Sequence, residues 1–257
     1  MLGPDGIKDI AKMDPREGAA LLEAHIENFD GEAAMTMWLQ TKPKILYKGG
    51  ARSRFAAAFH PRENKFEVEV LFSKAPTDFH PTCNQIFYFG EELELALKYA
   101  WWAENRVPAE AACVLQVALP ASKMSEGVYV DDAKRWERLV WHSRRVDSHG
   151  QPLEAAPDTV VSLLNERILV GPICGMSPHV VQGLPRGGWQ RLTKIRLSNN
   201  QNATQVVFMN PRTFVERCEE ILWVLSSVSW RGNSSQDLLV MHGLRVQPLN
   251  VGQIAAS

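Results

Sequence analysis

The sequence lacks the cysteine patterns that hold metals or build disulfide frameworks. Its 257 residues include four cysteines, at positions 83, 113, 174 and 218, and no two of them form a C-x-x-C motif. Zinc sites need ligands paired at short spacing, so we expect no structural zinc and assign no metal ligand. Cys113 and Cys174 lie in apolar, strand-like runs and are predicted to be buried free thiols, which suits a reducing compartment.

Long hydrophobic runs and an excess of charge of one sign are also missing. No stretch approaches the ~18 apolar residues that span a bilayer, and the first residues have no apolar core of a secretory signal. The chain has 28 Lys and Arg against 29 Asp and Glu, a formal net charge of −1. It therefore has no general electrostatic attraction to nucleic acids or anionic membranes. We expect an intracellular protein, cytoplasmic or nuclear, with no membrane partner.

The common catalytic motifs are absent as well. The sequence contains no P-loop, no G-x-G-x-x-G after a strand, no H-E-x-x-H and no G-x-S-x-G. Its seven histidines are scattered, and nothing marks one of them as a general base. Polar residues of this kind are more often structural or solvated than catalytic.

What the sequence does contain is a series of short strands and well-capped helices. Strands are predicted at 44–50, 54–60, 65–72, 85–90, 112–120, 166–175, 189–197 and 204–209. Helices are predicted at 91–106, at 131–145, after Ser177, and at 210–228. Because strands and helices do not alternate regularly, a doubly wound parallel sheet is disfavoured and an α+β fold is expected. This domain, 42–228, follows an N-terminal helical extension (1–41) and precedes a C-terminal appendage (229–257).

Four segments stand out by their order along the chain. The first is LYKGG (46–50), a strand that ends in a cation and two glycines. The second, DFHPTCNQIFYFGEELELALKYA (78–100), is an aromatic strand that runs directly into a helix. The third, ERILVGPICG (166–175), is a strand that reaches Gly-Pro, and the fourth, TQVVFMNPRTF (204–214), is a strand that begins with glutamine.

These segments, in this order, resemble the motifs of the ADP-ribosyltransferase fold, in particular its ADP-ribosyltransferase-like domains in fungi and bacteria. The family's first strand typically reads Leu-Tyr-His-Gly or Leu-Tyr-Arg-Gly, and here it is Leu-Tyr-Lys-Gly at 46–49. The family's second motif is similar to 78–79 and 87–90, and its later Val-x-Gly-Pro is similar to 169–172. The resemblance covers about residues 42 to 225, and it implies a split mixed β-sheet with flanking helices that holds NAD in a cleft.

The resemblance also implies which residues bind the nucleotide. Lys48, followed by Gly49, stands where the family uses Arg or His to hold the ribose or pyrophosphate. Tyr88, before Gly90, would frame the nicotinamide pocket, since strand alternation directs Tyr88 away from its aromatic neighbours, which are expected in the core. A cationic pyridinium ring over an aromatic face gains ~1–2 kcal/mol when it is desolvated.

The position of the family's catalytic glutamate is occupied by Gln205. In the family this carboxylate stabilises the positive charge that develops on the ribose as the nicotinamide bond breaks. A glutamine can hydrogen-bond a ribose hydroxyl but brings no charge. Gly90 likewise replaces a Thr or Ser. Glu91 and Glu92 are candidates for a substitute catalytic carboxylate, and their alternative role is that of acidic residues in the first turn of a helix.

The resemblance therefore implies an NAD-dependent mono-ADP-ribosyltransferase, which would transfer ADP-ribose from NAD to an acceptor, or an NAD glycohydrolase. NAD would be the substrate, and protein, nucleic acid and water are all candidate acceptors. The missing carboxylate favours an alternative of another class, a pseudoenzyme that keeps the fold as a binding or interaction module. A third interpretation is an unrelated α+β protein.

Overall fold

The computed structural model of the protein describes residues 43–60, 65–83, 85–106, 111–119, 121–209 and 222–228. Within these residues the chain forms a mixed seven-stranded sheet accompanied by helices, together with a separate two-stranded sheet. The protein is therefore α+β, as the sequence predicts. The helical extension expected at 1–41 and the appendage expected at 229–257 lie outside the described residues.

The large sheet has the order β6-β7-β8-β4-β1-β5-β9, with every neighbouring pair antiparallel except β6 and β7. Its strands are β1 (Lys44–Ala51), β4 (Phe87–Gly90), β5 (Ala112–Leu119), β6 (Val128–Tyr129), β7 (Ile168–Pro172), β8 (Thr204–Phe208) and β9 (Leu222–Val228). The sequence thus predicts β1, β4, β5, β7 and β8 to within a few residues.

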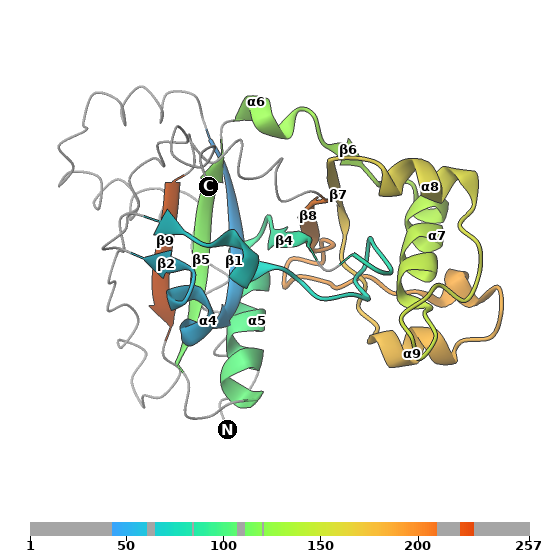
Figure 1. The fold of residues 1–257 in the computed structure, drawn as a ribbon, viewed down its shortest axis with the longest axis horizontal. Helices are drawn as coiled ribbons and strands as arrows, with labels where there is room; N and C mark the ends of the chain where they lie inside the picture. Colours follow the sequence, from blue (N-terminus) through green and yellow to red (C-terminus); the bar gives the residue numbers. More distant parts are fainter. Residues whose placement is uncertain are drawn as a thin grey trace.

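The helices lie at two places relative to the sheet. They are α4 (Arg52–Ala56), α5 (Leu93–Arg106), α6 (Ala121–Met124), α7 (Ala133–Arg144), α8 (Asp158–Leu164), α9 (Pro178–Gly183) and the 3-10 helices η1 (Val68–Leu71) and η2 (Gly188–Arg191). In Figure 1, α7, α8 and α9 gather beyond β7 and β8, whereas α5 lies along β1. The predicted caps are confirmed, since Asp132 accepts a hydrogen bond from the Arg135 N–H and Ser177 accepts one from the Val180 N–H.

Two strands expected near the start of the domain are wrong. Residues 54–60 form most of α4 and only a two-residue strand, β2 (Phe59–His60). Residues 65–72 begin with β3 (Lys65–Phe66) and continue as η1. The 3-10 turn directs two consecutive apolar residues to one core, which a strand would not do: Leu71 is fully buried and Val70 packs against the same core.

Two further expectations are wrong in the second half of the chain. Residues 189–197 contain η2 followed by isolated bridges rather than a strand. Residues 222–228, expected at the end of a helix, are strand β9, which pairs with β5 from Leu222 to Val228. The segment LWVLSSV is rich in β-branched and aromatic residues, and pairing with a buried neighbour outweighs its helical spacing.

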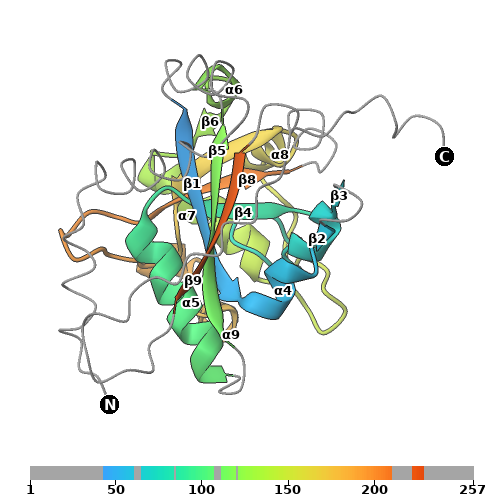
Figure 2. The same ribbon diagram turned by 90° about the vertical axis from the view of Figure 1, so that its left-hand side faces the viewer.

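The large sheet is divided in its middle. β1 pairs with β5 along its whole length, but it pairs with β4 at one position only, Tyr47↔Gly90. Figure 2 shows β4 running across the direction of β1 rather than alongside it. We therefore describe two half sheets, β1-β5-β9 and β6-β7-β8-β4, which meet at this single pair.

Side-chain packing holds the two half sheets together. One core contains buried residues of both, among them Leu46 and Leu115 from the first and Phe87, Phe89 and Val206 from the second. The edge-to-face contact of Phe89 with Phe208, at 6.0 Å between ring centroids, belongs to this core. The expectation that Phe87 and Phe89 are core residues is confirmed.

The other face of the second half sheet packs against helices. Tyr88, Leu169 and Val207 contact a second core, which includes Trp136 and Val140 of α7. Side chains alternate between the two faces along β4, β7 and β8, as strand geometry requires. Gln205, two residues before Val207 on β8, consequently lies on the same face as Tyr88.

Candidate functional site

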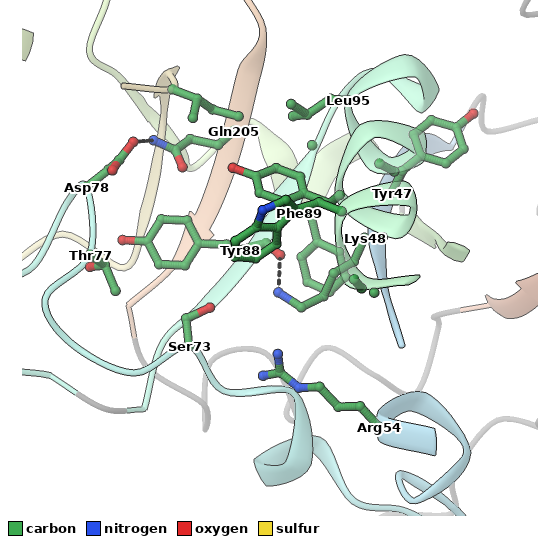
Figure 3. A pocket seen from close by; sticks show the side chains of 18 of the residues that line it. Tyr47, Lys48, Arg54, Ser73, Thr77, Asp78, Tyr88, Phe89, Leu95 and Gln205 are labelled. Atoms are coloured by element: carbon green, nitrogen blue, oxygen red, sulfur yellow. Dashed lines mark hydrogen bonds between the residues drawn. The ribbon is translucent and has the colours of Figure 1, made fainter. Parts of the chain in front are cut away.

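A cavity of about 540 Å³ lies where the two half sheets meet. This volume is within the range of ~300–1,000 Å³ that is usual for small-molecule sites. The residues that line it come from both half sheets, from α5 and from the loop before β4. They include every nucleotide-binding residue expected from the sequence, and Gln205 with them: Lys48, Gly49, Tyr88, Gly90 and Gln205. Figure 3 shows Lys48, Tyr88 and Gln205 among the side chains that line the cavity.

Strand register brings these residues together from distant parts of the chain. Gly90 of β4 pairs with Tyr47 of β1 on one side and with Gln205 of β8 on the other. Lys48 follows Tyr47 directly. The segments 46–50, 78–100 and 204–214, which stood out in the sequence, therefore meet at Gly90, between Tyr47 and Gln205.

Lys48 and Arg54 form a cationic wall on the side of β1. Lys48 Nζ donates a hydrogen bond of 2.8 Å to the Tyr88 carbonyl O, and Arg54 donates to the Val70 and Phe72 carbonyls at 3.1 and 2.7 Å. Burial, reinforced by the charge of Arg54, lowers the pKa of Lys48 to about 7. Both side chains thus have neutral backbone partners in these hydrogen bonds, so an anion bound beside them would meet the charge of Arg54 and would favour the protonated form of Lys48.

The Tyr88 ring lies on the opposite side of β4 from the aromatic core. Its hydroxyl accepts a hydrogen bond of 3.2 Å from the Phe79 N–H, which fixes the ring against the cavity. Burial first, and then the nearby Asp78 carboxylate, raise the pKa of the Tyr88 hydroxyl well above its ordinary value. Tyr88 is therefore a neutral, oriented aromatic wall.

Aromatic side chains of α5 line the mouth of the cavity, and sequence reasoning missed them. Tyr99 and Trp102 are 42% and 52% exposed, and the Arg106 guanidinium lies 4.6 Å from the centroid of the Trp102 ring. Their spacing of three and four residues places them on one face of a helix. This spacing in KYAWWAENR is the signal that could have identified them.

Gln205 is 4% exposed and has a defined set of partners. Its Nε2 donates to Asp78 Oδ2 at 3.1 Å and to the Pro172 carbonyl O at 3.3 Å. On the neighbouring strands Gln205 lies between Gly90 and Gly171. Other side chains fill the space beside these glycines, since an added Cβ would lie 2.7 Å from Leu95 Cδ2 at Gly90 and 3.2 Å from Phe79 Cζ at Gly171.

Asp78 is another residue that sequence reasoning missed as part of the site. Of the described residues that line the cavity, it is the acidic one. Arg144 Nε donates to Asp78 Oδ1 at 2.6 Å, and the two side chains form an ion pair whose members are 11% and 5% exposed. Burial, the largest single influence, lowers the pKa of Arg144, but the charge of Asp78 and the hydrogen bond to it, together with Cys174 and Tyr99, raise this pKa above its ordinary value. The signal available was its place at 78–79, part of a motif in which no role was assigned to Asp78 from the sequence.

The turn around Asp78 is held by its own hydrogen bonds. Thr77 Oγ1 donates to the His80 carbonyl O at 2.9 Å and accepts from the His80 N–H at 3.1 Å. His80 Nδ1 accepts from the Cys83 N–H at 2.9 Å. The carboxylate of Asp78 is therefore presented from a rigid loop.

Glu91 and Glu92, the candidates for a substitute carboxylate, are not among the described residues that line the cavity. Glu91 Oε1 pairs with Lys44 Nζ at 3.0 Å, and Glu92 accepts hydrogen bonds of 3.1 and 3.0 Å from the Thr204 N–H. These carboxylates tie the start of α5 to the neighbouring strands. Their positions do not support a role as a substitute catalytic carboxylate.

Gly49 lines the cavity, but its lack of a side chain has a structural reason. A Cβ at Gly49 would lie 1.7 Å from the Ala96 carbonyl O of α5. Helix α5 therefore packs on the backbone of β1 at this residue, with Ala96 and Ala100 in the same cluster. This close approach accounts for the glycine at position 49 and for the alanines at positions 96 and 100.

No protein-family model matches the chain, and no curated protein matches it either. None of the helices in the described residues has the length and apolar character needed to cross a membrane. Within the same residues, no group of His, Cys, Asp and Glu side chains is arranged to hold a metal ion. Cys113 and Cys174 are buried free cysteines, as the sequence predicts.

Proposed function

We propose that the protein binds NAD in this cavity as an ADP-ribosyltransferase-like protein, and that its reaction class is transfer of ADP-ribose from NAD to an acceptor or cleavage of NAD. The observation that carries the proposal is the convergence of Lys48, Tyr88 and Gln205, from three separate strands, on one cavity at the junction of two half sheets. The split of the sheet at a single residue pair supports the same family.

The chemistry of the walls suits the two ends of such a nucleotide. The side chains of Lys48 and Arg54 offer positive charge to the pyrophosphate, and Tyr88 offers an aromatic face to the nicotinamide ring. Gln205 offers an amide oxygen to a ribose hydroxyl. Tyr99 and Trp102, at the mouth, add aromatic surface for a second flat group.

The second candidate is a pseudoenzyme that binds NAD without cleaving it, and one observation favours it. Cleavage of the nicotinamide bond develops positive charge on the ribose, which a carboxylate would stabilise. The acidic side chain at the cavity, Asp78, is paired with Arg144, so its charge is already compensated. We therefore expect slow or absent turnover in the wild-type protein.

The proposal is tested by titrating the protein with NAD and assaying nicotinamide release on the same sample. We expect saturable binding that Tyr88→Ala weakens about tenfold, the loss expected for one desolvated cation–π contact. Tyr129→Ala is the matched control, because Tyr129 is 56% exposed and does not line the cavity. Absence of NAD binding to the wild-type protein would refute the proposal, whereas binding without release selects the pseudoenzyme.

A further inference from the structure

The amide of Gln205 is held by two groups that accept hydrogen bonds and cannot donate them. Both N–H groups of Nε2 are directed at acceptors, Asp78 Oδ2 at 3.1 Å and the Pro172 carbonyl O at 3.3 Å. Turning the amide over would set its oxygen against both acceptors, so one orientation is favoured. In Figure 3 the amide nitrogen is directed at Asp78 and the oxygen is turned away from it. Oε1 is therefore the atom that Gln205 offers to the cavity.

Asp78 is itself held as an acceptor. Its Oδ1 receives the Arg144 Nε–H at 2.6 Å, and its Oδ2 receives the Cys174 backbone N–H at 2.8 Å in addition to Gln205. Arg144 also donates to the Met176 carbonyl O, which anchors the guanidinium from its other end. Every partner of Asp78 in this network is a donor, so the network has a single polarity.

We infer that Asp78 and Arg144 are positioning residues that keep residue 205 a neutral hydrogen-bond acceptor. The site is therefore built for a glutamine at this position. It suits a ligand that brings a hydroxyl or N–H donor to the glutamine oxygen. A carboxylate at position 205 would lie as close to Asp78 as the amide nitrogen now does. Arg144 binds Asp78 through Oδ1, whereas Oδ2 is the oxygen that faces position 205, so a second carboxylate there would still meet a like charge. Like charges at this distance disfavour ionisation, so the introduced carboxyl would stay protonated. Restoring the charge of a transferase glutamate then requires a change at Asp78 as well.

An exchange of acid and amide between the two positions tests this inference. Asp78→Asn/Gln205→Glu keeps the net charge of the pair and reverses the direction of its hydrogen bond, while Gln205→Glu alone adds a second acid. The carboxyl at position 205 is titrated by carbon-13 NMR in both proteins. We expect it to ionise about one pH unit or more lower in the double variant than in the single one.

The activity readout rests on the proposed function, whereas the titration does not. Nicotinamide release from NAD should rise about 10²-fold over wild type in the double variant, and it should not rise in Gln205→Glu. Should no variant cleave NAD while the two titrations differ, the inference stands and the proposed reaction fails. If the carboxyl at position 205 ionises at the same pH in both variants and both variants cleave NAD at the same rate, the inference is overturned and the proposed function stays in place.

The matched control is Glu92→Gln/Gln205→Glu. Glu92 is also a carboxylate bonded to β8, at the Thr204 N–H, but it does not line the cavity. Its removal changes the charge by the same amount, so this control should titrate like Gln205→Glu alone. If the carboxyl at position 205 ionised at a lower pH in the control than in Gln205→Glu, the overall charge of the protein, and not Asp78, would determine its ionisation. That result would contradict the inference.

The wild-type protein provides a readout that does not depend on the folding of any double variant. The side-chain amide protons of Gln205, identified by their loss in Gln205→Ala, should exchange with water more slowly than those of the exposed Gln201. Asp78→Asn should accelerate this exchange, because the amide loses a charged acceptor. Exchange at Gln205 as fast as at Gln201 would overturn the inference.

Discussion

The two walls of the cavity handle charge in opposite ways. On the wall of the first half sheet, Lys48 and Arg54 are both cations, and the hydrogen bonds they make go to backbone carbonyls. On the wall of the second, Asp78 and Arg144 neutralise one another, and Asp78 accepts a hydrogen bond from Gln205. The difference teaches that positive charge remains for a ligand on one wall, while the other wall supplies a fixed hydrogen-bonding pattern without net charge.

We call the wall that contains Asp78, Arg144 and Gln205 the neutral wall. The largest effect on stability is expected from breaking its ion pair. Asp78→Ala leaves Arg144 as a buried, unpaired cation and should lower the free energy of unfolding by about 3–5 kcal/mol. Lys44→Ala breaks the more exposed pair with Glu91, whose members are 38% and 19% exposed, and should cost less than about 1 kcal/mol. Urea unfolding at pH 7 measures both values. Equal losses in the two variants would contradict the description of Asp78 and Arg144 as a buried pair.

A smaller loss is expected from changing the backbone of the cationic wall. Gly49→Ala would place a methyl group 1.7 Å from the Ala96 carbonyl O, so α5 must move away from β1. We expect a decrease of about 3 kcal/mol in the free energy of unfolding. At Gly183 no atom lies within 4 Å of an added Cβ, so Gly183→Ala is the control and should change stability by less than about 0.5 kcal/mol. A tolerated Gly49→Ala would show that α5 can shift without cost.

The smallest effect is expected from pH, which changes the charge of Lys48 on one wall of the cavity. Since the pKa of Lys48 is lowered to about 7, a rise in pH removes its charge in the free protein, whereas Arg54 remains charged. An anion that binds beside Lys48 favours the protonated form, so NAD affinity should be greatest below pH 7 and fall by up to about tenfold per pH unit above it. Isothermal titration from pH 6 to 9 measures this. Lys48→Met should abolish the dependence, and Lys44→Met, outside the cavity, should retain it.

The parts of the site that strands carry could be predicted from the sequence, because alternation and motif order fix which residues meet. Lys48, Tyr88 and Gln205 belong to this class, and each lies on a strand whose range was predicted closely. The neutral wall could not be predicted in this way. Asp78 and Arg144 are 66 residues apart, one in a loop and one at the end of a helix, and no local pattern relates them.

The errors in the fold have the same physical origin. The spacing of apolar residues in 65–72 and 222–228 predicts that each segment has one apolar face, but it does not decide whether the backbone is a strand or a helix. In β9 the deciding factor is the ladder with β5, and in η1 it is the packing of Leu71 into the shared core. Both depend on partners distant in the sequence.

The single pair at Tyr47↔Gly90 gives the sheet an edge in its interior. Beyond Tyr47, β1 continues through Lys48 to Ala51 with β5 on one side and the cavity on the other. Amide protons of this stretch that point toward β5 belong to a ladder, while those that point toward the cavity lie on an open edge. Hydrogen exchange along four consecutive residues of β1 should therefore alternate between slow and fast in the free protein. A ligand seated against this edge would slow the fast positions, and the number of positions that it slows would measure how far along β1 it extends.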